Sequence, residues 1–407
     1  MKKLTFWEIV FVSLVLSTAI ASAQTILSST HAGQTLGPVA VATPVPPGFF
    51  PFGGGLTDVL AANVDSEGQL KVIDWSTYEG ILVRNGEAIY EPQDVEGSLP
   101  TSISAVGLDS EHIITAHVDG VGRLAIISWQ LGCTSSSVCL VKAVSVPNYA
   151  TAAYPYVAQA VSVTALSSTQ VVTAAVNYDD DLAVQVWNIN PTTYLPTAAG
   201  PAQTYESVQA VAVAAINSGQ VVTAVQNADG TEELALYNVG RKTVNRVATA
   251  RGSSYAVSQV ALASDFFGDI FTANVKAGDG DLSIVYWTVS NSGSKVTLVS
   301  TGSVQKGSGE HQIAAGWMSA IDFLTFTDVG STAPVTAMGD ASGDLDVDFW
   351  SNSKELRHNA TNDTIDTIGI VPLGAIFSVA RNKSVSYFAT GDRSSSTGDL
   401  EIKLWSD

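Results

Sequence analysis

The sequence repeats itself about every fifty residues, and this period limits the possible fold more than any other feature. Most copies read Thr-Ala, a polar stretch, Leu and four further residues before a terminal aromatic residue. The terminal aromatic residues are Trp75, Trp129, Trp187, Tyr237, Trp287, Trp350 and Trp405, with successive spacings of 54, 58, 50, 50, 63 and 55 residues. Six copies carry Leu five residues earlier, and the fourth carries Glu232 there. Such a period is typical of chains in which each copy forms one supersecondary unit.

Each copy reads as a set of short β-strands. An apolar run such as 221–225 is followed by a turn rich in Asp, Asn and Gly and by a second apolar run, which is the pattern of a hairpin. One strand precedes the hairpin and a weaker one follows it, so each copy has the four strands of a propeller blade. Leu and the aromatic residue five positions later point to opposite faces, as a blade packed between two others requires. We therefore predict an all-β fold, a seven-bladed β-propeller with four antiparallel strands per blade, over residues 24–407.

The last copy stops at the end of the chain, so its outermost strand has to come from elsewhere. Residues 36–44 resemble outer strands such as 246–250. We expect residues 36–44 to complete the seventh blade and so to close the ring, which would hide open sheet edges. A linear array of blades is the alternative.

The segment VSQVALASDFFGDIFTANVKAGDGDLSIVYW resembles the FG-GAP and VCBS-type repeats of integrin-like propellers. The order of strands and Asp/Gly turns matches over nearly all of residues 36–407. The resemblance implies calcium-binding loops between the first two strands of each blade, but here only Asp265 to Asp269 keeps a trace of them. The chain is thus similar to secreted bacterial propellers with degenerate calcium loops, and we predict no cofactor, with inherited calcium sites disfavoured.

The amino terminus has the features of a Sec-type signal peptide. Lys2 and Lys3 precede an apolar stretch over 9–20, and Ala21-Ser-Ala23 is a small-residue cleavage pattern. We expect residues 1–23 to be removed and the mature chain to be secreted or periplasmic, without a membrane span. In such a compartment the close pair Cys133 and Cys139 favours a local disulfide that staples a hairpin.

The charge balance limits the partners. Without residues 1–23 the chain has 17 basic and 37 acidic side chains, a net charge of −20. That charge disfavours nucleic acid and anionic lipid, and it favours cations or a basic partner, although solubility alone also explains it. Acidic residues gather on the hairpin turns: Asp65, Glu67, Asp119, Asp179, Asp180, Asp181, Asp229, Glu232, Glu233, Asp279, Asp281, Asp340, Asp344, Asp392 and Asp399.

Two of these turns are the candidate metal sites. Asp179, Asp180 and Asp181 are consecutive, and Asp279 and Asp281 flank a glycine. Each set has fewer oxygen ligands than calcium requires. Ordinary turn chemistry is the competing interpretation.

A recurrent amide is the candidate ligand-binding feature. Gln159, Gln209, Gln259 and Gln312 open the innermost strands, and an aromatic residue or histidine precedes each one: Tyr156, Tyr205, Tyr255 and His311. In a propeller these residues would ring one mouth of the central channel. Amides beside aromatic faces suit a polar neutral ligand such as a sugar. The alternative is that each amide satisfies backbone groups between blades.

The sequence does not decide whether the chain is an enzyme. It holds five histidines without metal-binding spacing, and neither a Gly-x-Ser-x-Gly elbow nor a Walker loop. This favours a non-catalytic recognition protein, which we expect to be a monomer that binds a glycan or a protein at the channel mouth. A hydrolase or lyase that uses the central pocket and a structural envelope or matrix protein are the other hypotheses. Trp317, outside the repeat register, would plug the channel or line a pocket.

Overall fold

The computed structural model describes residues 25–42, 44, 58–78, 81–90, 100–120, 122–133, 139–143, 148–149, 158–177, 179–264, 268–292, 295–306, 312–320, 331–339, 344–351, 357–367, 377–382, 385–394 and 396–406. Within these residues the regular elements are β-strands. The predicted signal peptide, residues 1–23, lies outside them. No helix in the described part of the chain is long and apolar enough to cross a membrane.

The strands of the first half are β1 (Thr25–Ala42), β2 (Asp58–Asp65), β3 (Leu70–Tyr78), β4 (Ile81–Tyr90), β5 (Ser102–Gly107), β6 (His112–Val118), β7 (Leu124–Cys133), β8 (Cys139–Ala143), β9 (Asn148–Tyr149), β10 (Ala158–Ser167), β11 (Gln170–Asn177), β12 (Asp181–Ile189) and β13 (Pro196–Ala198). Those of the second half are β14 (Gln203–Asn217), β15 (Gln220–Asn227), β16 (Thr231–Val239), β17 (Val244–Ser264), β18 (Asp269–Lys276), β19 (Leu282–Ser292), β20 (Lys295–Lys306), β21 (Gln312–Ala320), β22 (Ser331–Gly339), β23 (Asp344–Ser351), β24 (Arg357–Thr367), β25 (Phe377–Asn382), β26 (Val385–Arg393) and β27 (Asp399–Ser406).

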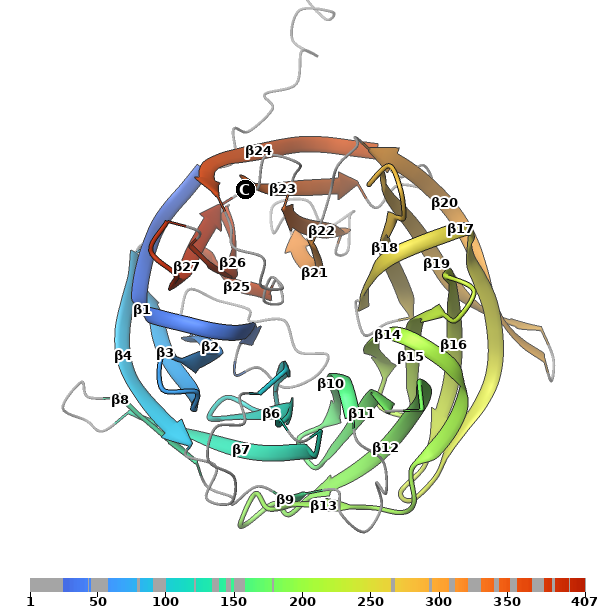
Figure 1. Ribbon diagram of the computed structural model, residues 1–407, viewed down its shortest axis with the longest axis horizontal. Helices are drawn as coiled ribbons and strands as arrows, with labels where there is room; N and C mark the ends of the chain where they lie inside the picture. Colours follow the sequence, from blue (N-terminus) through green and yellow to red (C-terminus); the bar gives the residue numbers. More distant parts are fainter. Residues whose placement is uncertain are drawn as a thin grey trace, which may run out of the picture.

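The strands form antiparallel four-stranded units, one for each repeat of the sequence. The order β5-β6-β7-β8 is one such unit, and β21-β22-β23-β24 is another. Figure 1 shows the units arranged around a central axis, with strands such as β2, β10 and β21 nearest the centre and β4, β20 and β24 at the outside. The fold is thus all-β and propeller-like.

Three long strands each belong to two consecutive units. The first part of β14, residues 203–207, pairs with β12, and residues 208–217 pair with β15. In the same way β17 pairs first with β16 and then with β18. Each strand therefore leaves one unit as its outermost strand and enters the next as its innermost strand.

The third such strand, β1, joins the two ends of the chain and corrects our expectation for residues 36–44. Residues 25–34 pair with the last strand, β27, whereas residues 35–42 pair with β2. Residues 36–42 are therefore not the outer strand of the last unit, whose outer strand is formed by residues 25–34 instead. The physical reason is burial: Val39 to Ala42 are all at most 4% exposed, as an innermost strand requires, while outer strands keep one face in water.

The hydrophobic core lies between units. Trp187 of the third unit packs in one cluster with Ile114 and Leu124 of the second unit. Leu182 lies in the next cluster with Tyr237 of the fourth unit, so Leu and the aromatic residue face opposite neighbours, as their spacing predicts. The first and last units pack in the same manner, because Trp75 shares a cluster with Leu400.

The repeated tryptophans are tied to the repeated threonines. Trp187 is fully buried, and its indole Nε1 donates a hydrogen bond to Thr173 Oγ1 at 2.9 Å. The same bond joins Trp129 to Thr115, Trp287 to Thr272 and Trp405 to Thr390, at 2.8, 3.0 and 2.9 Å. In the first unit Ala61 replaces the threonine, and Trp75 Nε1 is buried without a hydrogen-bond partner. The Thr-Ala signature is thus a partner for the aromatic residue of its own unit.

Two further expectations concern residues whose side chains are not described. Cys133 and Cys139 are direct backbone partners in the β7–β8 ladder, and the disulfide between them stays a prediction. Trp317 lies in β21, opposite Pro334. Its place relative to the channel also stays a prediction.

Removing the threonine hydroxyl from one unit, or adding it to the unit that lacks it, tests the Thr–Trp hydrogen bond. Thr173→Val removes the acceptor and leaves a buried indole N–H unsatisfied, which should lower the free energy of unfolding by about 1–3 kcal/mol. Ala61→Thr supplies the missing acceptor to Trp75 and should raise it by roughly 1 kcal/mol. Urea unfolding of both variants measures these changes. A destabilised Ala61→Thr variant would show that the first unit lacks room for the hydroxyl.

Candidate functional site

The candidate site lies where the hairpin turn of one unit meets the innermost strand of the next. Ala158 N donates to Gly122 O at 2.6 Å, Val257 N to Gly230 O at 2.7 Å, and Val208 N to Asp180 O. Thr35 N donates to Gly398 O at 2.9 Å, which repeats this contact between the last unit and the first. Each accepting residue has a positive φ, between 62° and 84°. This conformation suits glycine best and is also adopted by aspartate, so Asp180 can take the glycine position in the third unit.

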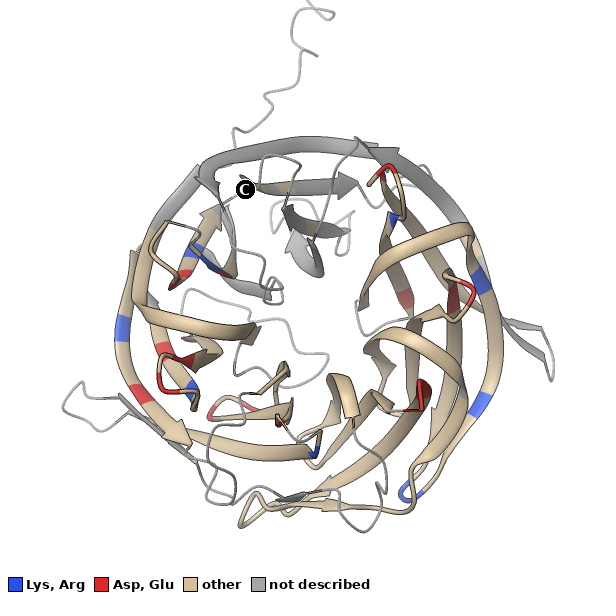
Figure 2. Cartoon of the chain, viewed as in Figure 1, with Lys and Arg blue, Asp and Glu red and all other residues tan. Residues whose placement is uncertain are grey.

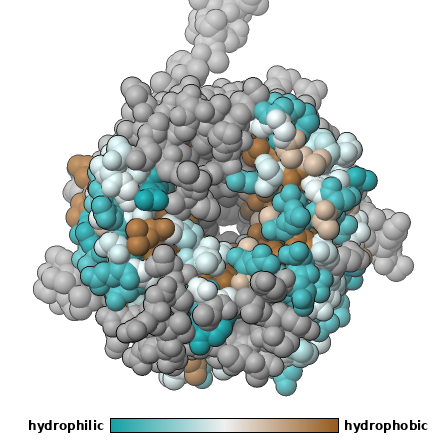
Figure 3. All heavy atoms as spheres, in the orientation of Figure 1, coloured by the Kyte–Doolittle hydropathy of each residue, from teal (hydrophilic) through white to brown (hydrophobic). Residues whose placement is uncertain are grey.

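Hydroxyl groups join the innermost strands around the centre. Val161 N and Val163 N donate to the hydroxyls of Ser102 and Ser104, each at 3.1 Å. Ser162 and Thr164 then accept from Val213 N and Ala215 N, at 3.1 and 3.0 Å. These bonds satisfy backbone donors on the inner edge of each sheet, which would otherwise be open. Figure 3 shows a narrow opening at the centre of this face.

The four candidate amides do not share one position in the register. Gln159 and Gln209 are the extra residues at two bulges, one near the start of β10 and one where β14 passes from β12 to β15. In β17 the residue skipped by the register is Ser258, and Gln259 pairs with Val275. Gln312 has the same relative position as Gln259, because it pairs with Gly339, three residues after the threonine of its unit.

The physical reason for this difference is a deletion of one residue. The threonines of the third and fourth units are 50 residues apart, but Thr223 and Thr272 are 49 apart, whereas Gln209 and Gln259 are 50 apart. The amides therefore do not form the uniform ring that their spacing predicts. Gln159 and Gln209 share the bulge position, whereas Gln259 and Gln312 share a paired position.

Gln159 and Gln209 lie on either side of Asp180. Gln159 Nε2 donates to Asp180 Oδ1 and to Asn177 O, both at 3.3 Å. On the other side, Val208 N donates to Asp180 O, which places Gln209 next to the same turn. All three side chains are exposed. We call Gln159, Asp180 and Gln209 the amide–carboxylate site.

The predicted aromatic partners do not line this site. Tyr156 and His311 lie outside the described residues. Tyr205 packs against Tyr237, with ring centroids 5.3 Å apart, and Arg246 lies over its ring at 4.9 Å. The Tyr255 hydroxyl donates to Asn274 Oδ1 at 3.1 Å. Both tyrosines thus serve contacts between units.

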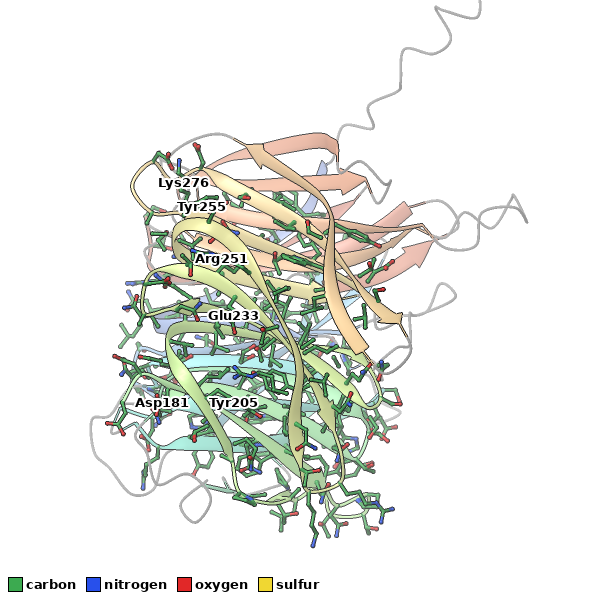
Figure 4. All side chains as sticks on the ribbon, turned by 90° about the vertical axis from the view of Figure 1, so that its right-hand side faces the viewer. Asp181, Tyr205, Glu233, Arg251, Tyr255 and Lys276 are labelled. Carbon is green, nitrogen blue, oxygen red and sulfur yellow. The ribbon has the colours of Figure 1, made fainter. Side chains whose placement is uncertain are left out.

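The acidic hairpin turns that the structure describes lie on one face, while Asp340 of the predicted set lies outside the described residues. Figure 2 shows this face toward the viewer, and Figure 4 shows Asp181 and Lys276 at the same edge of the molecule. Many of these residues build their turns: Asp65 Oδ1 accepts from the backbone N–H of Glu67 and Gln69, both at 2.9 Å. Asp119, Glu232 and Asp392 are buried rather than exposed, so this face carries fewer charges than the sequence count suggests.

The two candidate metal sites differ in their surroundings. The Lys276 ammonium forms an ion pair with Asp279 and lies 4.0 Å from Asp281. In the third unit Asn177 Oδ1 accepts from Asp179 N and Asp181 N at 2.9 and 2.8 Å, so the asparagine side chain holds the turn. Asp179 is exposed and Asp181 is half-buried. The described residues contain no group of three or more His, Cys, Asp or Glu side chains placed to hold a metal ion.

Glu232 is a buried carboxyl group that the sequence analysis treated only as one of the acidic turn residues. Its side chain is buried where other units have leucine, and Asn274 Nδ2 donates to its Oε2 at 2.7 Å. A Cβ on Gly252 would lie 2.4 Å from that oxygen, so the glycine makes room for the carboxyl group. Burial raises the pKa of Glu232 from 4.5 to about 7, against the lowering effect of the Asn274 hydrogen bond. In the sequence, Glu232 stands where other repeats have leucine. Together with Gly252, this exception could have indicated a buried carboxyl group.

Two more sets of buried charges lie in the first and last units. Asp74 is fully buried and accepts from Asn85 Nδ2 at 3.1 Å, and burial raises its pKa to about 7, with a further contribution from Asp58. The Lys403 ammonium is buried between Asp392 and Glu401, at 3.1 and 2.9 Å. These carboxylates satisfy the ammonium inside the last unit, as a buried charge requires.

No protein-family model matches the chain, and no curated protein sequence matches it significantly. Its structure is similar to a chain of the outer coat vertex of COPII on membranes, with a TM-score of 0.51 and 12% identity over 92% of this chain and 84% of that one. A chain of the COPII coat assembled on membranes gives the same TM-score and identity, and the match spans 92% of this chain and 47% of that one. The amino-terminal part of BBS1 in complex with ARL6 gives a TM-score of 0.47 at 10% identity, over 94% of this chain and 96% of that one. At these identities the COPII likeness shows the propeller-like fold alone.

The buried position of Glu232 predicts a pH-dependent stability. Its pKa is higher in the folded chain than in the unfolded one, so the folded state binds the proton more tightly. The unfolding free energy should therefore fall as the pH rises from about 4.5 to about 7, by about 3 kcal/mol from this group. Glu232→Gln should remove that part of the dependence and be more stable than wild type above pH 7.

Urea unfolding at several pH values measures the difference between wild type and variant. The difference isolates Glu232, because Asp58 and Asp74 also have raised pKa values and titrate in both proteins. Glu233→Gln, at the half-buried neighbouring residue, is the control and should keep the wild-type profile. Parallel curves for wild type and Glu232→Gln would show that Glu232 does not titrate in this range.

Proposed function

We propose that the chain is a closed seven-bladed β-propeller that acts as a non-catalytic recognition protein. Closure is supported by the pairing of β1 with both β27 and β2, and by the packing of Trp75 against Leu400. In such a ring every unit, including the first and the last, has a neighbour on each face. The predicted FG-GAP or VCBS-type relationship belongs to this proposal.

The ligand site is at the central mouth of the hairpin face, at the amide–carboxylate site. The observation that carries this is the repetition of an exposed amide, Gln159 and Gln209, at the same bulge in two adjacent units with Asp180 between them. The fixed turn holds the carboxylate in place, because Asp180 O accepts from the next unit. Two amides and one carboxylate present both donors and acceptors, which suits the hydroxyl groups of a glycan or the backbone of a protein ligand.

The setting of this function follows the sequence. The predicted signal peptide supports a secreted or periplasmic bacterial protein, and the pair Cys133 and Cys139 supports a disulfide there. A monomer is expected, because each unit of a closed ring covers the apolar faces of its neighbours. The carboxylates of Asp179, Asp180 and Asp181 are optional ligands of calcium, and a cationic partner suits the acidic face.

Binding of the wild-type protein to a glycan array, with and without calcium, tests the proposal. We expect Gln159→Ala/Gln209→Ala to weaken binding of a recognised glycan at least about fivefold, because each amide contributes about 0.5–1.5 kcal/mol through hydrogen bonds. Titration calorimetry with that glycan gives the change. If the array shows no ligand, a protein ligand at the same mouth is tested with the same variant.

The matched control is Gln170→Ala/Gln220→Ala. These amides begin the second strands β11 and β15, at the opposite end of their units from the hairpin turns. The control should keep wild-type affinity. Equal affinity of wild type and Gln159→Ala/Gln209→Ala, or an equal loss in the control, would refute the site.

A further inference from the structure

A buried lysine in the last unit lies between two carboxylates. Lys403 Nζ is 3.1 Å from Asp392 Oδ2 and 2.9 Å from Glu401 Oε2. None of the three side chains is more than 5% exposed. Asp392 on β26 pairs directly with Glu401 on β27, and Lys403 lies two residues further along β27. The ammonium group thus contacts carboxylates from both strands of the last hairpin.

The fold does not require a lysine at this position. Lys403 stands two residues before the terminal aromatic residue of its repeat, and no other repeat has a basic residue there. The equivalent residues are Ile73, Ile127, Gln185, Ala235, Val285 and Asp348. Replacing a buried ion pair by apolar residues is often neutral or stabilising. The stability of the last unit alone therefore does not account for the lysine and its two carboxylates.

This contact holds an amine and a carboxyl group together where water is excluded. Burial lowers the pKa of Lys403, and the two carboxylates raise it by more, so the ion pair is the resting state. Within such a pair a proton can pass from Nζ to a carboxylate, which leaves an amine beside a carboxylic acid. Reacting groups held at about 3–3.5 Å have a high effective molarity, and the exclusion of water hinders hydrolysis of the product.

We propose that Lys403 and Asp392 form an amide bond that joins β26 to β27 covalently. The lysine transfers one proton to the Asp392 carboxylate, and Nζ then attacks the Cγ atom of the resulting carboxylic acid. Glu401 takes a second proton from Nζ and passes it to the departing hydroxyl group, which leaves as water. The ammonium and the carboxylate thus become one amide and one water molecule. Glu401 is unchanged, and no oxidant, reductant or cofactor is consumed.

The amide bond lies in the hairpin that joins the two ends of the chain. β27 pairs with β26 on one side and with residues 25–34 of β1 on the other. A covalent link between β26 and β27 therefore limits fraying of the strand on which β1 pairs. This modification is separate from the amide–carboxylate site and does not depend on a ligand there.

Peptide mass spectrometry of the whole chain tests the proposal. The folded, purified protein is kept for several days, denatured and digested with trypsin, which does not cut after an acylated lysine. We expect residues 384–393 and 394–407 to appear as one branched peptide, lighter by one water than the sum of the two. The internal control is Lys71, whose ion pair with Glu87 at 2.7 Å is partly exposed to water. Cleavage after Lys71 should stay complete.

Two variants separate the roles of the residues. Lys403→Met should give the two peptides separately, because the attacking amine is missing. Glu401→Gln should form the branched peptide at least about tenfold more slowly, because the proton carrier is missing. Both variants should keep the tryptophan fluorescence of the folded wild type.

Three results would contradict the proposal. Complete cleavage after Lys403 in the wild type would show that no amide forms. A water lost only within residues 394–407, without a branched peptide, would place the bond on Glu401 instead of Asp392. Equal rates in wild type and Glu401→Gln would remove Glu401 from the reaction.

Discussion

Each four-stranded unit has two apolar faces, and the rest of the structure follows from the need to cover both. In the third unit Trp187 and Leu182 face different neighbours, and neither face would be stable in water. A linear stack of such units would leave one face bare at each end. Trp75 of the first unit packs in one cluster with Leu400 of the last unit, so these two units also share an apolar contact.

The polar contacts set the position of one unit on the next. A turn residue with positive φ presents its carbonyl group to the N–H at the start of the following inner strand. Serine and threonine hydroxyls then fix the inner strands to each other, as between Ser104 and Val163. Because these bonds recur at the inner ends of the units, the residues beside them, such as Gln159 and Gln209, occupy equivalent places around the mouth.

Much of the fold could be predicted from the sequence, because the terminal aromatic residues and the leucines before them report burial on both faces. The strand order also followed from the repeat. The role of residues 36–44 was wrong, because inner and outer strands have similar compositions and only pairing tells them apart. The amides were partly misplaced, because a single-residue deletion in the fifth unit changes the register without changing the spacing of Gln209 and Gln259. Glu232 could be seen as an exception, but its partner Asn274 belongs to another repeat and no sequence pattern links the two.

The double use of β1 has a consequence for how the chain is made. Residues 25–34 are synthesised well before their partner β27, which lies more than 360 residues further along the chain. This part of β1 must therefore remain without that partner until β27 has been made. An unpaired strand is prone to wrong pairings. The pairing of β1 with β27 thus forms only after every unit between the two strands has been synthesised.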